Sequence, residues 1–148
     1  MIEAELKTHV HAPESVTRQL DGRATARVEV YRDTYYDRPD GSLGKAGQEL
    51  RVRAVQGANS TRVLLTFKDA AVDQDSESKP EHQTIVEDAS AAHAILRGLG
   101  YIEFIAFEKR CRNYESRCAA GACSPFSAAC RSWMGHSWRW RRSSTRTR

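Results

Sequence analysis

Ile2-Glu3-Ala4-Glu5-Leu6-Lys7 opens the chain with apolar and charged residues in strict alternation. Successive side chains of a β-strand point to opposite faces, so this stretch predicts a strand with one apolar face and one charged face. The charged face carries two carboxylates and an ammonium group. Strands with a similar charged face recur later in the chain.

Two later strands repeat the pattern with the opposite charge. Residues 49–55 place Arg51 and Arg53 on one face, and residues 61–68 place Lys68 on the same parity as Thr66. A sheet with one side in water would explain this alternation equally well from the pattern alone. The alternative is a sheet that closes on itself with these faces inward. Each enclosed charge would then cost several kcal/mol unless it is compensated. A polyanion bridged to the carboxylates by a divalent metal would compensate these charges.

The order of elements favours an antiparallel α+β fold over a parallel doubly wound sheet, because strands and helices do not alternate strictly. In the second helix, Ser90 is the expected N-cap and Ala92, Ala94, Ile95 and Leu96 the expected apolar face. The sequence predicts strands at 2–10, 25–36, 49–55, 61–68, 81–87 and 101–114, helices at 12–20 and 88–98, and loops at 38–47 and 69–80.

The charge of the chain is unevenly distributed. Residues 115–148 contain seven arginines against Glu115 alone, a net charge of +6, so the total of +4 leaves −2 for residues 1–114. The basic character therefore belongs to the tail, and we do not expect nucleic acid as a partner. No apolar run is long enough to cross a bilayer, and the acidic start does not resemble an export signal, so a cytoplasmic location without membrane contact is predicted.

Motifs in the first 114 residues resemble those of the CYTH superfamily, which includes class IV adenylyl cyclases, thiamine triphosphatases and inorganic tripolyphosphatases. Glu3-Ala4-Glu5-Leu6-Lys7 matches the opening E-x-E-x-K signature. The resemblance is closest to class IV adenylyl cyclase. The further matching elements, in chain order, are Asp33 to Asp37, Leu50 to Arg53, Lys68, Lys79 to Gln83, Ile95 to Tyr101, and Lys109 with Arg112 and Tyr114.

The resemblance implies an antiparallel eight-stranded β-tunnel with flanking helices that encloses a triphosphate, here incomplete at the C-terminus. It implies Mg²⁺ or Mn²⁺ as cofactor, and a catalytic role for Lys7 in contacting phosphate or positioning the nucleophile. The implied metal ligands are Glu3, Glu5 and Glu81, and the implied phosphate-binding residues are Arg51, Arg53, Lys68, Lys109 and Arg112.

The activity implied is conversion of ATP to cyclic AMP and pyrophosphate. A metal-dependent triphosphatase acting on thiamine triphosphate, tripolyphosphate or a nucleoside triphosphate is the alternative, and a nucleic-acid-binding module working through the basic tail is a remote one. A homodimer is left open. Two positions depart from the family pattern, because Gln83 stands where a second carboxylate is usual and Cys111 where a basic residue is common.

The tail at 115–148 matches no CYTH element and is predicted to be either a disordered basic segment or an out-of-frame product. Trp and Met have single codons, so part of the neighbouring frame can be recovered. Read one base earlier, the stretch from Ser132 to Arg142 gives L-D-G-x-F-L-E-V-E-T if Arg139 and Arg141 use AGR codons, which resembles the missing late strand. Loss of closing strands predicts poor stability and weak activity.

Four residues on the second strand have simpler interpretations. Glu29 and Asp33 are expected to pair with neighbouring strands, and Tyr35 and Tyr36 to be core residues rather than base-stacking groups. His93 is expected at the surface or in packing rather than as a metal ligand.

Overall fold

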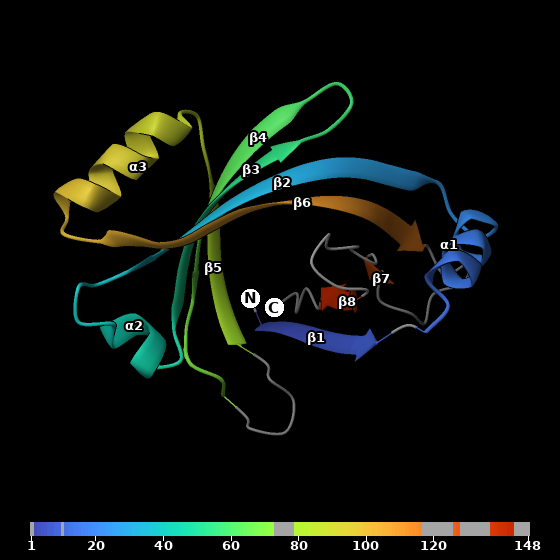
Figure 1. Cartoon of the computed structure of the whole chain (residues 1–148), viewed down its shortest axis with the longest axis horizontal. Coiled ribbons are helices and arrows are strands. Elements are labelled where there is room, and N and C mark those ends of the chain that lie inside the picture. The colour runs from blue at the N-terminus through green and yellow to red at the C-terminus, as the bar shows by residue number, and fades with distance from the viewer. Residues whose placement is uncertain (1, 10, 73–78, 117–125, 128–136, 144–148) are drawn as a thin grey trace, which may run out of the picture.

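The computed structural model describes residues 2–9, 11–72, 79–116, 126–127 and 137–143 (Figure 1). Strands and helices follow the predicted order through the first 114 residues. The elements are β1 (Ile2–His9), α1 (Pro13–Asp21), β2 (Ala26–Asp37), α2 (Ser42–Lys45), β3 (Glu49–Gln56), β4 (Thr61–Lys68), β5 (Lys79–Val86), α3 (Ala89–Gly98), β6 (Ile102–Ser116), β7 (Phe126–Ser127) and β8 (Ser137–Ser143).

The strands form a closed barrel in the order β1-β5-β4-β3-β2-β6-β7-β8, and every paired neighbour is antiparallel. This confirms the predicted antiparallel α+β tunnel with flanking helices. Figure 1 shows α1 at one end of the long β2 and β6 strands, and α2 and α3 at the other. The short α2 helix was not predicted, because its residues lie in a segment rich in Gly and Pro.

The barrel wall extends into the tail, which we expected to lack strands. β6 continues to Ser116, and β8 pairs with β1 from Glu3 opposite Ser143 to His9 opposite Ser137. The sequence does carry a signal for β8, since Trp and Arg alternate from Trp138 to Arg141 with a period of two. Apart from β7 (Phe126–Ser127), the remaining tail residues lie outside the described residues, and the frame-shift hypothesis stays a prediction.

The outer face of the wall packs against α3. Leu50 and Val52 of β3 and Val63 of β4 form a core cluster with Ala92 and Leu96 of α3. Burial of each such side chain contributes about 1.5–3 kcal/mol. Apolar residues of β3 and β4 thus lie under the helix, and the alternate residues of the same strands point to the barrel interior.

Two details of α3 differ from the prediction. The N-cap is Asp88, whose side chain accepts hydrogen bonds from the backbone N–H groups of Ser90 (2.7 Å) and Ala91 (3.3 Å), so Ser90 lies within the first turn. Ala94 is exposed and Ile95 is 61% exposed, so neither belongs to the buried face. The helix is rotated so that Ala92 and Leu96, four residues apart, meet the sheet.

Candidate triphosphate site in the barrel interior

The strand register brings charged residues from five neighbouring strands to the inner face. Asp33 of β2 is opposite Arg53 of β3, and Lys68 of β4 is opposite Glu81 of β5. Residues directly opposite each other in a sheet share a face, and this face points away from α3. On the far side of β2, Lys109 of β6 is opposite Tyr31.

Asp33 and Arg53 form a buried two-pronged ion pair. Nε and Nη2 of Arg53 donate to the two carboxylate oxygens of Asp33 at 2.6 and 2.7 Å, and the ammonium group of Lys109 lies 3.3 Å from the same carboxylate. Burial alone raises the pKa of Asp33, but the hydrogen bonds and positive charges of Arg53 and Lys109 outweigh it, so the pKa of Asp33 lies below its usual value. Asp33 therefore fixes two of the predicted phosphate-binding cations in place.

Arg51 is buried in a different way, with 3% of its surface exposed. Its Nη1 donates to the hydroxyl of Tyr35 at 3.3 Å, and the guanidinium lies over the Tyr35 ring with 5.6 Å to the centroid. Among the described residues its Nε and Nη2 have no hydrogen-bond partner. Buried donors are nearly always paired, so this guanidinium has capacity for an anion that the described residues of the wall do not supply.

Lys68 and Glu81 form a second buried pair, with 3.3 Å between Nζ and Oε2 and about a tenth or less of each side chain exposed. Among the buried charges of the described interior, the cations Arg51, Arg53, Lys68 and Lys109 outnumber the carboxylates Glu29, Asp33 and Glu81 by one. An enclosed positive excess of this kind is stabilised by a bound anion.

The predicted metal ligands come from two adjacent strands. β1 pairs with β5 so that Glu3 is opposite Lys79, which puts Glu3 on the diagonal from Glu81. The side chains of Glu3, Glu5 and Lys7 lie outside the described residues, and within that description no three His, Cys, Asp or Glu side chains form a group able to hold a metal. The donor type fits, because Mg²⁺ and Mn²⁺ prefer carboxylate oxygens and the buried Glu81 supplies them.

Arg112 does not join the other predicted phosphate-binding residues. It pairs with Val28, which is exposed on the outer face, and its Nη2 donates to Asp21 of α1 at 2.9 Å. Its Nε also donates to the hydroxyl of Tyr114, and hydrogen bonds to Tyr114 and Asp21 raise the pKa of Arg112. Arg112 therefore fastens α1 to the barrel. It lies three residues after Lys109 on the same strand, and an odd step along a strand places the two side chains on opposite faces.

The side-chain network around Glu29 supports the inner face beyond Lys109. Glu29 is 2% exposed, and it accepts from the hydroxyl of Tyr31 at 2.9 Å and from the amide of Asn113 at 2.7 Å, while Arg62 lies 3.1 Å away. The expectation that Glu29 and Asp33 pair with neighbouring strands is confirmed. Tyr31 also lies under the charged groups of Arg53 (4.6 Å to the ring centroid) and Lys109 (5.7 Å).

Tyr31, Tyr35 and Asn113 position the site, yet the sequence alone did not identify them. Their contacts depend on cross-strand register, which residue spacing within one strand does not reveal. Tyr36, by contrast, is buried as expected, and its hydroxyl is hydrogen-bonded to His93 beneath α3. None of the described helices is long and apolar enough to span a membrane.

Solved structures resemble this fold over nearly the whole chain. A protein from Pyrococcus horikoshii is 20% identical with a TM-score of 0.79, covering 98% of this chain and 80% of its own. A candidate adenylate cyclase from Vibrio parahaemolyticus is 17% identical with a TM-score of 0.73, covering 97% and 77%. A candidate adenylyl cyclase from Hippeastrum, described as having a dominant triphosphatase activity, is 16% identical with a TM-score of 0.68, covering 97% and 79%.

These identities establish the fold, and the family follows from the sequence match. No curated protein matches the chain. The family model for the CYTH domain matches residues 1–121, a little beyond the predicted boundary at Tyr114. Members of this family are typically cyclases or triphosphatases that bind triphosphates and generally depend on metal. The chain belongs to the CYTH domain family.

Proposed function

We propose that the protein is an adenylyl cyclase of the class IV type, which converts ATP to cyclic AMP and pyrophosphate with Mg²⁺ or Mn²⁺. The observation that carries the proposal is the buried Arg51, whose Nε and Nη2 have no hydrogen-bond partner within the described structure. A phosphate oxygen can accept from both nitrogens, and a polyanion can also reach the other cations of the same face, Arg53, Lys68 and Lys109.

Each cation has a distinct part in holding the substrate. Arg51 donates directly to a phosphate oxygen. Arg53 and Lys109 are anchored by Asp33, so they supply a fixed positive field without losing side-chain freedom when the substrate binds. Lys68, beside Glu81, neutralises charge at the opposite side of the triphosphate. Alignment and charge neutralisation account for most of the catalysis in phosphoryl chemistry.

Glu3, Glu5 and Glu81 would hold the divalent ion, which when bound draws negative charge from the phosphate oxygens. Lys7, on the same strand as Glu3 and Glu5, would position the attacking group. In the cyclase, the ribose 3′-oxygen forms a bond to the α-phosphorus, its proton leaves, and the bond to pyrophosphate breaks. The preference for this reaction rests on the resemblance of Asp33 to Asp37, of the loop at 38–47 and of Lys109 to Tyr114 to the cyclase branch.

Triphosphate hydrolysis is the second candidate, and the Hippeastrum neighbour with its dominant triphosphatase activity supports it. The same cations would hold the substrate while water attacks the terminal phosphorus. We propose a cytoplasmic enzyme with the triphosphate as its partner, and a homodimer stays open. Nucleic acid is not part of the proposal, because the cations described above face the barrel interior.

Incubation of the full chain with ATP and Mn²⁺ separates the two reactions. Cyclic AMP with an equal amount of pyrophosphate supports the cyclase, and orthophosphate supports the hydrolase. Arg51→Ala is expected to abolish either activity, whereas Arg112→Ala keeps the substrate site intact. If the wild-type chain releases neither product and binds neither ATP nor inorganic tripolyphosphate, the proposed function is wrong.

A further inference from the structure

An exposed aromatic residue lies at an irregularity in β6. The β2–β6 register places Tyr35 opposite Ile105 but Tyr36 opposite Glu103, so Phe104 is the extra residue of a β-bulge. Bulges re-aim side chains and often lie beside functional sites. Phe104 is 73% exposed, more than any other aromatic residue among the exposed large hydrophobic residues of the described chain.

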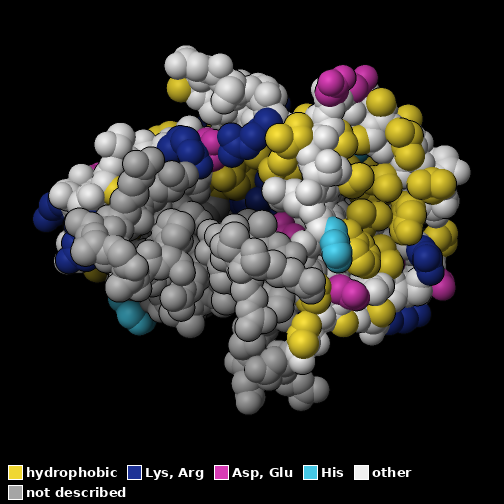
Figure 2. Space-filling model, turned by 180° about the vertical axis from the view of Figure 1, so that it is seen from behind, with side chains coloured by type: hydrophobic (Ala, Val, Ile, Leu, Met, Phe, Trp, Pro, Cys, Tyr) yellow, Lys and Arg dark blue, Asp and Glu magenta, His cyan; other side chains and the backbone are white. Residues whose placement is uncertain are grey.

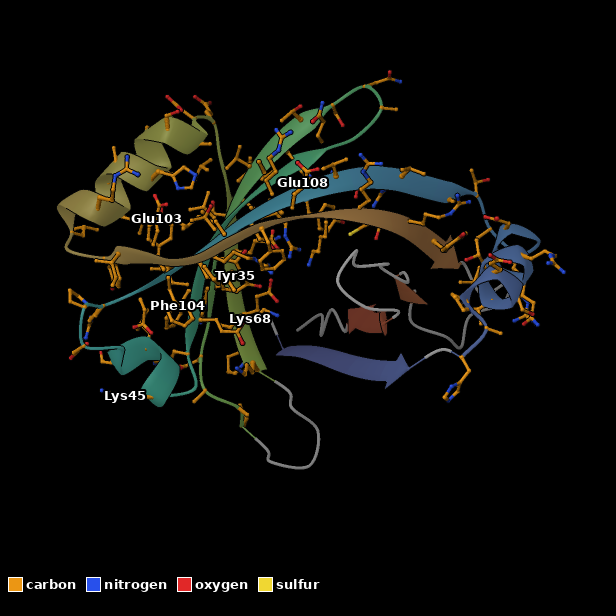
Figure 3. All side chains as sticks on the ribbon, viewed as in Figure 1. Tyr35, Lys45, Lys68, Glu103, Phe104 and Glu108 are labelled. Carbon is orange, nitrogen blue, oxygen red and sulfur yellow. The ribbon has the colours of Figure 1, made fainter. Side chains whose placement is uncertain are left out.

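The side chains of Glu103 and Phe104 point to opposite faces of the wall. Glu103 accepts from the hydroxyl of Tyr36 at 3.3 Å and from Arg97 of α3 at 3.0 Å, which fixes it on the helix side. Figure 3 shows Phe104 extending from β6 to the other side, where Tyr35 and Lys68 also lie. Phe104 is therefore on the face that carries the candidate triphosphate site.

Apolar and aromatic side chains lead from that site to Phe104. Tyr35, which accepts from Arg51, stacks on Phe107 with 5.9 Å between ring centroids and 17° between the planes. Exposure along β6 then rises from 37% at Phe107 to 48% at Ile105 and 73% at Phe104. Hydrophobic side chains gather at the end of the molecule that bears α2 and α3 (Figure 2). The row begins beside the guanidinium of Arg51 and ends in solvent.

We propose that Phe104 is the stacking platform for the nucleobase of the substrate. The row of side chains is cationic at Arg51 and apolar at Phe104. It therefore matches a ligand that has a triphosphate at one end and a flat aromatic ring at the other. A ring stacked on Phe104 would cover the surface that the fold leaves exposed. The inference rests on the proposed function and deepens it, because it selects a nucleoside triphosphate over inorganic tripolyphosphate.

The test compares two ligands that share the phosphates and differ in the base. Binding of ATP and of inorganic tripolyphosphate to the full chain is measured by titration calorimetry with Mg²⁺. Phe104→Ala is expected to weaken ATP binding on the order of 10-fold, as removal of a base-stacking ring does, and to leave tripolyphosphate binding unchanged. Phe104→Trp is expected to retain ATP binding. Leu99→Ala is the matched control, since Leu99 is the C-cap residue of α3 and is 69% exposed.

Three outcomes overturn the inference. ATP affinity that is unchanged in Phe104→Ala shows that no ring stacks there. Equal losses for ATP and tripolyphosphate show a structural role instead. The third outcome is a wild-type dimer in sedimentation that dissociates in Phe104→Ala, while the ratio of the affinities for ATP and tripolyphosphate stays constant. It shows that a second copy of the chain covers Phe104. A wild-type chain that binds neither ligand refutes the proposed function itself, which distinguishes that failure from the failure of Phe104 alone.

Discussion

Arg53 donates from two nitrogens to both carboxylate oxygens of Asp33, at 2.6 and 2.7 Å, across adjacent strands of the barrel wall. Two residues away on the same strand and face, Arg51 has two nitrogens with no such acceptor in the described structure. The ion pair of Arg53 and the two unfilled donors of Arg51 predict different consequences for stability and for ligand binding.

Asp33→Asn is expected to destabilise the protein by about 3–5 kcal/mol, because it leaves Arg53 and Lys109 buried without their countercharge. Urea unfolding measures the change. Glu108→Gln is the matched control, since it breaks an exposed pair with Arg32 of 2.9 Å and is expected to cost at most about 1 kcal/mol. Equal effects of the two substitutions would contradict the assignment of Asp33 as an anchor.

Arg51→Ala is expected to lower the affinity for inorganic tripolyphosphate about 100-fold or more, because two charge-assisted hydrogen bonds are lost. The free energy of unfolding should stay constant or rise, since the substitution removes buried unpaired donors. Arg51→Lys keeps the charge without the planar guanidinium, so its affinity for tripolyphosphate should lie between those of the wild type and Arg51→Ala. Arg112→Ala serves as control for affinity, and an equal loss there would argue against an interior site.

The pH dependence of stability should carry the signature of Asp33. Its pKa in the folded state is lowered, so its contribution is fully present above its unfolded pKa of about 3.9 and is lost as the pH falls through the folded value. Unfolding free energy measured from pH 7 downward should therefore decline in acid. In Asp33→Asn this decline should be shallower, and an unchanged slope would show that the acid sensitivity comes from other carboxylates.

Gln83→Glu is expected to tighten Mn²⁺ binding by about 3- to 10-fold, because it restores a carboxylate next but one to Glu81 on the inner face. The hydroxyl of Thr66 already donates to Oε1 of Gln83 at 3.2 Å, and a carboxylate can accept the same bond. Electron paramagnetic resonance of free Mn²⁺ gives the affinity. Thr84→Glu adds the same charge on the opposite face of β5, so an equal gain there would mean a nonspecific charge effect.

The origin of the tail can be settled at the level of DNA. Sequencing across the codons for Tyr114 to Cys118 is expected to reveal a gained or lost base, with the neighbouring frame continuing as an acid-pair strand. AGR codons are expected at Arg139 and Arg141. CGN codons at both positions, with an uninterrupted frame, would instead identify the tail as the native sequence. A chain with the frame restored should be more active and should unfold at higher urea.

Strand periodicity predicted a charged face at Arg51, Arg53 and Lys68, which is the inner face in the structure, whereas the closed barrel was implied by the family resemblance. The sequence failed where the deciding information is a cross-strand neighbour. Arg112 looked like Lys109 because both are basic and close in the chain, but the three-residue step between them turns Arg112 outward to Asp21. No periodic pattern in the sequence indicates the position of Phe104, since the bulge that exposes it depends on how β2 and β6 align.

β1 pairs with β8 at seven positions and with β5 at two. The segment that bears Glu3, Glu5 and Lys7 is thus paired chiefly with β8, which comes after β2 to β6 in the chain, while β2 to β6 form a continuous ladder without it. A growing chain can complete the strands that carry its arginines and lysines before β8 has been made, but the acidic strand β1 can pair fully only after β8 has been synthesised. Affinity for the anion and capacity for the metal would then be acquired at separate moments of synthesis, and a chain ended before Ser137 would keep the first and lose the second.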